Sequence, residues 1–327
     1  MSSSEPPLQA EPGRRVAVTG ASGFVGRHLV RELVVQGLQP RILTRRDPVV
    51  PEWRDIEIEV VPGELGDAAA LRRLVTGADA VIHLAGLIKA ASTAQFMAVN
   101  RDGTRAVAEA VRQHAPNAHF LHVSSLAARE PQLSGYAASK RAGETVALDL
   151  LGATASVLRP PAVYGPGDRE TLIFFQLAAQ RTAWLPGGPA ARTALIHVAD
   201  LAAALARMAT APASGRVQST ADARPAGYSW REILESAARA GGNTAAKFRN
   251  APRLPLQALA FAGDTARRFG YAKMLTSEKL RELLHPDWAV APQELARIPG
   301  WQPRFDLDRG FHDAVAWYRK AGWLSAA

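Results

Sequence analysis

The sequence predicts an α/β protein: a doubly wound parallel sheet followed by a smaller, mostly helical C-terminal domain. Near the N-terminus, an apolar strand leads through three glycines, at positions 20, 23 and 26, into an amphipathic helix. Apolar segments of strand length then alternate with helical segments as far as Arg159. After Pro160-Pro161 this periodicity weakens. Strands that alternate with helices indicate right-handed crossovers and therefore a parallel sheet.

Hydrophobic periodicity indicates the bounds of each element. Strands are expected from residue 16 and over 41–44, 56–61, 80–85, 119–124 and 156–159. Helices are expected over 24–36, 68–75, 93–114, 136–151, 171–181, 198–209, 229–240, 256–269, 276–284 and 307–320. Ser229 and Glu232 have the spacing of a capping box, and Gly37 is the expected C-cap of the first helix.

Composition excludes several classes of function. The 327 residues contain no cysteine, so disulfides, thiolate metal sites and thiol catalysis are ruled out, and a reducing, cytoplasmic location is expected. The net charge of +9 is spread along the chain without interleaved aromatic residues, which argues against a nucleic-acid partner.

No apolar run approaches the ~20 residues of a membrane span, so no integral span is expected. Arg267-Arg268 beside an apolar segment suggests contact with a membrane surface, but a solvated helix face is the favoured interpretation.

The stretch from Val16 to Gly26 has the pattern of a dinucleotide site. In α/β proteins, a strand, a glycine-rich turn and a helix N-terminus together bind a pyrophosphate. A positive φ or a close backbone approach explains Gly20 and Gly23, because a Cβ there would stand between backbone N–H groups and phosphate. Gly26 allows the helix to pack closely on the strand. The helix N-terminus supplies N–H donors and the positive end of the helix dipole.

Tyr136 and Lys140 place a phenol and an ammonium group on one helix face, at i and i+4. The pKa of an unperturbed tyrosine is about 10, and a nearby lysine favours the phenolate. Tyr136 is therefore expected to donate or accept a proton near neutral pH. Ser125 follows a buried strand at its C-terminal end, where open α/β sheets bind ligands, and can hydrogen-bond a substrate oxygen. His83, His122 and His197 lack metal-ligand spacing with acids, and no metal site is expected.

With these motifs, the sequence resembles the extended short-chain dehydrogenases/reductases, of the NAD(P)-dependent epimerase/dehydratase group. The resemblance runs from Arg14 to about Leu324. Its motifs are a TGxxGxxG turn at 19–26, HLAG at 83–86, NRDGT at 100–104, RPPAVYGPG at 159–167, HVADLA at 197–202 and YSW at 228–230. The resemblance implies a Rossmann-type fold and hydride transfer between a nicotinamide and a substrate.

The resemblance also implies the roles of individual residues. Ser125, Tyr136 and Lys140 fall on the catalytic triad, and Asn100 would organise the active-site helix. Lys140 would also bind the hydroxyls of the nicotinamide ribose. The implied cofactor site consists of Gly20, Ser22, Gly23, Phe24, Val25, Gly26, Thr44, Arg45, Arg46, Glu64, Leu65, Leu84, Ala85, Gly86, Ser124, Tyr136, Lys140, Pro160 and Val163.

The expected domain organisation follows from these motifs. Residues 1–13 are expected to be a disordered leader and residues 14–165 a dinucleotide-binding domain. A segment near 190–215 returns to that domain, and residues 166–327 are mainly the substrate domain. Relatives commonly pair two long helices of each subunit, and helices 93–114 and 136–151 would do so here, which implies a homodimer.

The cofactor is expected to be NADP, with NAD as the alternative. Users of NAD usually carry an Asp at the end of the second strand, where this chain has Thr44 followed by Arg45 and Arg46. Two guanidinium groups would bind a 2′-phosphate, which an acid would repel. Asp47 lies close enough in sequence to serve the ribose of NAD instead.

Other departures bear on the substrate. The acid pair of the family's dehydratases is replaced by Leu126 and Ala127, and the Tyr-Gly of the sugar epimerases by Arg129-Glu130. The arginine that holds a nucleotide diphosphate is replaced by Thr193, with Arg192 one position away. These changes favour simple carbonyl reduction or alcohol oxidation of a small molecule. A sugar-nucleotide epimerase with retained cofactor and a non-catalytic nucleotide-binding subunit are the alternatives. The second domain's aromatic residues, Trp184, Trp230, Tyr271 and Trp288, are interpreted as core rather than as an apolar substrate site.

Overall fold

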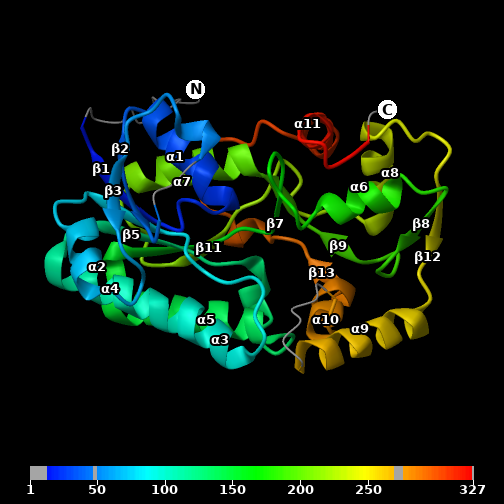
Figure 1. Ribbon diagram of the computed structural model, residues 1–327, viewed down its shortest axis with the longest axis horizontal. Helices are drawn as coiled ribbons and strands as arrows, with labels where there is room; N and C mark the ends of the chain where they lie inside the picture. Colours follow the sequence, from blue (N-terminus) through cyan, green and yellow to red (C-terminus); the bar gives the residue numbers. More distant parts are fainter. Residues whose placement is uncertain (1–12, 47–49, 269–274, 326–327) are drawn as a thin grey trace. The chain divides into compact units, whose positions relative to one another are not determined.

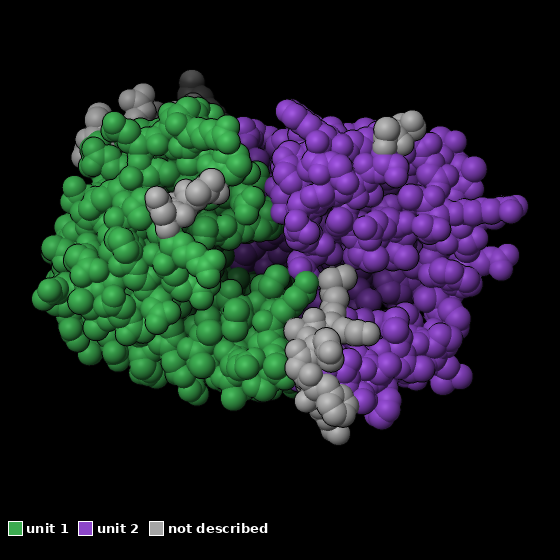
Figure 2. Space-filling model, viewed as in Figure 1, with its two compact units in different colours: residues 1–159, 201–219, 296–302 green, residues 160–200, 220–295, 303–327 purple. Residues whose placement is uncertain are grey.

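The computed structural model describes residues 13–46, 50–268 and 275–325. Close packing divides the chain into two compact units (Figure 2). Unit 1 comprises residues 1–159, 201–219 and 296–302, and unit 2 comprises residues 160–200, 220–295 and 303–327.

Unit 1 is built on one parallel sheet of seven strands (Figure 1). Its order is β11-β6-β5-β4-β1-β2-β3, and every pairing is parallel. The strands are β1 (Arg15–Thr19), β2 (Gln39–Thr44), β3 (Glu59–Pro62), β4 (Ala80–His83), β5 (His119–Val123), β6 (Ala155–Arg159) and β11 (Val217–Ser219). The order reverses beside β1, so the crevice at its carboxyl end is the position where such sheets bind ligands. The predicted doubly wound parallel sheet is confirmed.

Helices cover both faces of this sheet. Figure 1 shows α2 (Ala68–Val75), α4 (Gly103–His114) and α5 (Gly135–Leu151) on one side, and α1 (Phe24–Val35) and α7 (Val198–Thr210) on the other. Leu71, Val107 and Phe120 belong to the core between the sheet and the first of these layers. Strands buried on both faces explain the continuous apolar runs in the sequence.

Two elements of unit 1 differ most from expectation. The strand expected over 56–61 begins only at Glu59, because Ile56 closes the turn after a short 3₁₀ helix, Pro51–Trp53, through a bond from its N–H to the Trp53 carbonyl. The helix expected over 93–114 is α3 (Thr93–Met97), a π-helical segment (Ala98–Asp102) and α4. Such π segments often occur at functional sites.

Unit 2 combines five helices with three parallel strand pairs among the described residues. The helices are α6 (Leu172–Ala178), α8 (Trp230–Ala240), α9 (Arg253–Arg268), α10 (Ser277–Leu284) and α11 (Leu307–Lys320). The pairs are β7 (Ala162–Tyr164) with β10 (Leu195–His197), β8 (Thr182–Leu185) with β12 (Lys247–Asn250), and β9 (Arg192–Thr193) with β13 (Asp287–Trp288).

The core of unit 2 is aromatic. Tyr164, Phe175, Trp230, Phe311 and Tyr318 are buried in one cluster. The interpretation of Trp230 as core is therefore correct, whereas Trp184 is 44% exposed and Tyr271 lies outside the described residues. The capping box of α8 is present as expected. Among the described residues, every helix is too short or too polar to cross a bilayer.

Candidate active site

The glycine turn after β1 lies against the end of β4. Gly20 has φ +73°, and a Cβ added to it would lie only 2.6 Å from the Ala85 backbone nitrogen. A Cβ on Gly26 would collide with the carbonyl oxygens of Gly20 and Ala21. The two glycines therefore let the turn, the start of α1 and the Leu84–Ala85 segment approach one another at backbone distance.

The N-terminus of α1 is open at this turn. Its N-cap, Gly23, provides no side-chain acceptor for the first N–H groups, and the first turn contains no acid. Ser22 and Gly23 are exposed, and Phe24 and Val25 are half-buried. A phosphate would receive these N–H donors and the positive end of the helix dipole. The turn therefore fits the pyrophosphate of a dinucleotide.

The carboxyl ends of β2 and β3 hold the residues expected near the adenosine. Arg45 and Arg46 are exposed directly after β2. The Thr44 hydroxyl donates to the Arg46 carbonyl at 2.7 Å and so holds this short turn. Glu64 is exposed after β3, and Leu65 packs beside Gly103 at the start of α4. Asp47 lies outside the described residues.

Asn100 joins the loop after β4 to α5. The side-chain amide of this buried residue accepts from the Leu87 N–H at 2.7 Å and donates to the Leu87 carbonyl at 3.0 Å. It also donates to the Ser139 hydroxyl at 2.8 Å, which in turn donates to the Tyr136 carbonyl. Gly86 is needed beside it, since a Cβ there would lie 2.9 Å from the Asn100 oxygen. Asn100 thus fixes the loop of the HLAG motif against the helix that carries Tyr136 and Lys140.

Tyr136 is the second residue of α5. The Ser134 hydroxyl caps this helix by accepting from the Ala137 N–H at 3.0 Å. The ring of Tyr136 packs edge-on against Phe96, with centroids 5.9 Å apart. Its position in the first turn and this aromatic contact orient a half-buried phenol at the N-terminal end of α5.

Lys140 lies one turn further along α5 and is buried. Its ammonium group donates to the Val123 carbonyl at the end of β5, at 2.8 Å. Burial lowers its pKa from 10.5 to about 8, although the charge of Glu144 acts in the opposite direction. A lysine that is charged at neutral pH but loses its proton readily is suited to support proton transfer by a neighbouring phenol.

Ser125 and Ser124 follow β5 but have different surroundings. Ser125 is half-buried and caps a short 3₁₀ helix, Leu126–Arg129, by accepting from the Ala127 N–H. The buried Ser124 hydroxyl donates to Glu144 at 2.6 Å instead of facing a ligand. The side chain of Ser124 is thus structural, and its backbone N–H donates to the Leu158 carbonyl at 2.7 Å.

Sequence reasoning missed Glu144 as a site residue. Glu144 follows Lys140 by four residues on α5, and its side chain is 2% exposed. Its carboxylate accepts from Ser124 on β5's C-terminal side and from the Arg159 guanidinium at the end of β6. The spacing Tyr136, Lys140, Glu144 on one helix face was the available signal.

Two buried histidines lie beneath this group. His83 bonds Thr19 at 2.7 Å and Thr104 at 3.1 Å, and its ring stacks on His122 with centroids 5.4 Å apart. Burial, with a smaller effect of the Lys140 charge, lowers the pKa of His83 to about 3 and moves that of His122 in the same direction. Both rings are therefore neutral, and the described residues contain no cluster that could hold a metal ion.

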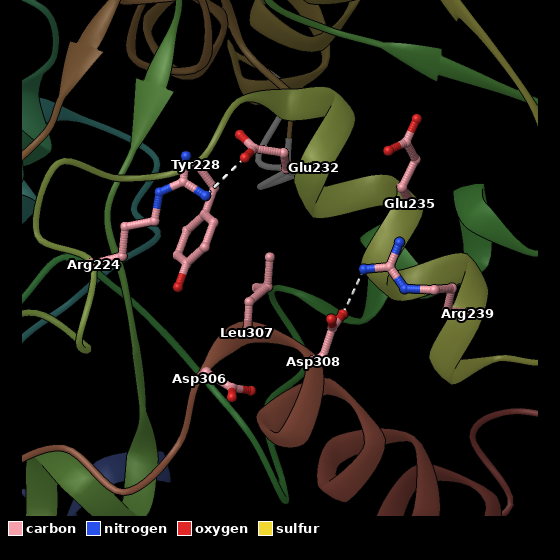
Figure 3. Close-up of a pocket in the computed structure, with 8 residues that line it drawn as sticks. All are labelled: Arg224, Tyr228, Glu232, Glu235, Arg239, Asp306, Leu307 and Asp308. Carbon is pink, nitrogen blue, oxygen red and sulfur yellow. Dashed lines mark hydrogen bonds and ion pairs between the residues drawn. The ribbon is translucent and has the colours of Figure 1, made fainter.

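The remaining predicted residues belong to unit 2. Pro160 is buried and Val163 lies in β7. Arg192 donates to the Pro189 and Ala191 carbonyls of its own loop, which accounts for its side chain without a nucleotide diphosphate. A cavity of about 310 Å³ lies in this unit, and none of its lining residues, drawn in Figure 3, is a predicted site residue. Its two arginines are paired, Arg224 with Glu232 at 2.7 Å and Arg239 with Asp308 at 2.6 Å.

This sheet and glycine turn, with a Tyr-Lys helix beside them, define a nucleotide-binding oxidoreductase. The sequence model described as "NAD dependent epimerase/dehydratase family" matches residues 16–221, and the chain belongs to this family. It is 49% identical over 319 residues to the ceramide reductase of Caulobacter vibrioides, covering 94% of this chain and 96% of that protein.

Two further comparisons agree with this assignment. The chain is 29% identical to the 4-hydroxy-2-methyl-3-oxo-4-farnesyl-3,4-dihydroquinoline-1-oxide ketoreductase of Stigmatella aurantiaca, over 64% of this chain and 69% of that protein. Its fold matches the solved structure of MoeE5 in complex with UDP-glucuronic acid and NAD, with a TM-score of 0.69 and 21% identity, covering 94% of this chain and 100% of that one. The protein is an NAD(P)-dependent oxidoreductase, and the epimerase alternative is not favoured.

Proposed function

We propose that this enzyme reduces a ketone of a ceramide-type lipid to the secondary alcohol, with NADPH as the preferred reductant. The 49% identity to a ceramide reductase over nearly the full length of both chains is the observation that supports this proposal. The farnesylated substrate named for the second relative is also a lipophilic ketone. A polar nucleotide-sugar substrate is disfavoured because Arg192 is bonded to its own loop.

Three residues of unit 1 perform the proton chemistry in this proposal. The bound nicotinamide supplies a hydride to the carbonyl carbon. The phenol of Tyr136 donates its proton to the carbonyl oxygen as the C=O π pair moves onto that oxygen, and solvent later returns a proton to the phenolate. The Ser125 hydroxyl orients the same oxygen. Lys140, held by the Val123 carbonyl, stabilises the phenolate and binds the ribose hydroxyls.

The proposed preference for NADPH depends on Arg45 and Arg46. Both side chains are exposed at the carboxyl end of β2, the strand beside the glycine turn, and no acid occupies the position of Thr44. The 2′-phosphate of NADPH would form charge-assisted hydrogen bonds with these guanidinium groups. The other proposed binding residues are those of the glycine turn, with Glu64, Leu65, Leu84, Ala85, Gly86, Ser124, Pro160 and Val163.

We also propose a cytoplasmic homodimer. The helices α4 and α5 pack side by side along one face of unit 1, the arrangement in which relatives pair two helices of each subunit. Sedimentation of the purified chain tests this association. A nicotinamide-dependent reductase without cysteine suits the cytoplasm, and fractionation of the source cells tests the location.

A substrate assay tests the proposed reaction. The purified chain is mixed with NADPH or NADH and with a detergent-dispersed N-acyl amino ketone of ceramide type, and loss of reduced-cofactor absorbance is followed. Turnover that requires the ketone, with a lower KM for NADPH, is expected. Turnover of UDP-glucose or UDP-glucuronic acid, with none of the lipid ketone, would overturn the proposal.

A further inference from the structure

Helix α9 of unit 2 exposes an apolar face to solvent. Leu254, Leu259 and Phe261 are 77%, 59% and 71% exposed. Leu254, Ala258, Phe261, Ala262 and Thr265 follow one another at helical spacing on the outward side, and all are exposed. These five residues are uncharged, which is the reverse of the usual pattern for the outward side of a surface helix.

The opposite face of α9 is the one that packs. Ala260 is fully buried, and Gly263 lies so close to the Leu275 carbonyl that a Cβ would collide with it. The partner among the described helices is α10 (Figure 1). Asp264, the single acid of α9, accepts from the Ser277 N–H at 3.1 Å on this packed side. The apolar residues therefore face outward because the helix is anchored by its small residues.

Basic residues precede and end α9 along the chain. Between residues 247 and 268 the sequence has five basic residues and one acid. Lys247 and Arg249 on β12 and Arg253 at the start of α9 are exposed. A helix with a large apolar face and basic residues beside it lies in the interface of an anionic membrane, with its apolar side chains among the acyl chains.

We propose that α9 is a membrane-docking helix, which seats unit 2 on an anionic lipid surface. A second copy of the chain explains the face less well. The three large side chains expose on the order of 400 Å², about half of the ~800 Å² per partner that a stable protein interface buries. The docking is inferred from the surface of α9 alone. Its role in reaching a substrate in the bilayer rests on the proposed function.

Vesicle sedimentation tests the docking without turnover. The full chain is mixed with vesicles of phosphatidylglycerol and phosphatidylcholine, or of phosphatidylcholine alone. We expect binding to the anionic vesicles that weakens with added salt and with neutral lipid. The L254Q/F261Q variant should lower the vesicle-bound partition coefficient at least tenfold, and R249Q/R253Q should remove most of the salt dependence.

The matched control is V35Q, because Val35 in α1 is an equally exposed apolar side chain, at 72%, outside the proposed surface. It should bind vesicles as the unaltered chain does. Circular dichroism and NADPH affinity confirm that each variant is folded. Equal vesicle binding by L254Q/F261Q and the unaltered chain would overturn the docking. If the variant instead changed only its oligomeric state in sedimentation, the docking would also be overturned, and α9 would be an interface between copies of the chain.

The same experiment separates the docking from the proposed function. Vesicle binding without turnover of the dispersed lipid ketone would support the docking and contradict the proposed ceramide-type substrate. Turnover of the dispersed ketone without vesicle binding would support the proposed substrate and contradict the docking.

Discussion

The carboxylate of Glu144 and the guanidinium of Arg159 form a buried bidentate pair, with hydrogen bonds of 2.7 Å from Nε and 2.5 Å from Nη2. Glu144 lies on α5 and Arg159 ends β6. The same carboxylate accepts from Ser124 after β5. One side chain therefore ties two neighbouring strand ends to the helix that carries Tyr136 and Lys140.

Breaking this pair should destabilise the fold. Glu144→Gln leaves the Arg159 charge buried without a counter-charge, and we expect a loss of about 3–5 kcal/mol in the free energy of unfolding. Urea denaturation monitored by circular dichroism measures it. The control is Glu235→Gln, which breaks the exposed pair with Arg231 and should cost under ~0.5 kcal/mol. Equal losses in the two variants would show that the buried pair does not stabilise the site.

Removing the proposed proton donor should stop turnover but not cofactor binding. In Tyr136→Phe, kcat should fall by about 10²–10⁴, because the ring still packs against Phe96 but has no proton to give. Steady-state assays and fluorescence titration with NADPH measure the two quantities. Tyr228→Phe is the control, since that phenol bonds Asp222 within unit 2 and should leave kcat within a few-fold. An unchanged kcat in Tyr136→Phe would refute the proton path.

Activity should depend on the charge of Lys140. Burial lowers the pKa of Lys140 to about 8, so the ammonium is present below that pH and lost above it. The kcat/KM for ketone reduction should therefore be level below about pH 8 and decline above it. Lys140→Arg keeps its charge throughout this range, and the decline should move to higher pH even if the maximum rate is lower. The same pH dependence of kcat/KM in the unaltered chain and in Lys140→Arg would show that a group other than Lys140 causes the decline.

Cofactor preference should depend on the two arginines after β2. Arg45→Ala/Arg46→Ala should raise the Kd for NADPH about tenfold, through loss of charge-assisted bonds to the 2′-phosphate, and leave the Kd for NADH nearly unchanged. Calorimetric titration measures both constants. Arg54→Ala, which removes another exposed arginine, is the control. Equal affinity of the unaltered chain for the two cofactors would contradict an NADP site.

The buried histidines should make the protein sensitive to acid. The pKa of His83 is lowered to about 3, first by burial and then by the Lys140 charge. In the unfolded chain His83 takes up a proton near its ordinary pKa, so stability is present above about pH 6.5 and is lost as the pH falls toward 3. The loss is on the order of 4 kcal/mol.

Urea midpoints measured across this pH range test the acid sensitivity. His83→Asn should flatten the pH dependence, whereas His114→Gln, at an exposed position, should not. An unchanged slope in His83→Asn would show that other groups cause the acid sensitivity.

Local pattern was enough to predict most of unit 1. The helix expected over 68–75 has those bounds in the structure, as does the helix over 307–320 in unit 2, because amphipathic period and capping act within a few residues. The strand expected over 56–61 begins later in the structure. It is an edge strand that pairs only with β2, and the Ile56 N–H donates to the Trp53 carbonyl of the preceding 3₁₀ turn instead of to a strand. The π-helical segment that contains Asn100 could not be predicted, because it does not change the hydrophobic periodicity of the sequence.

The nucleotide turn, the Tyr136–Lys140 pair and the family were therefore accessible from the order of residues alone, because each depends on neighbours within one turn or one strand-to-helix connection. Tertiary structure decided three further properties. It paired Glu144 with Arg159, it lowered the pKa of Lys140 by burial, and it turned the apolar side of α9 outward. These depend on which distant segments exclude water from a side chain, and a linear pattern does not contain that information.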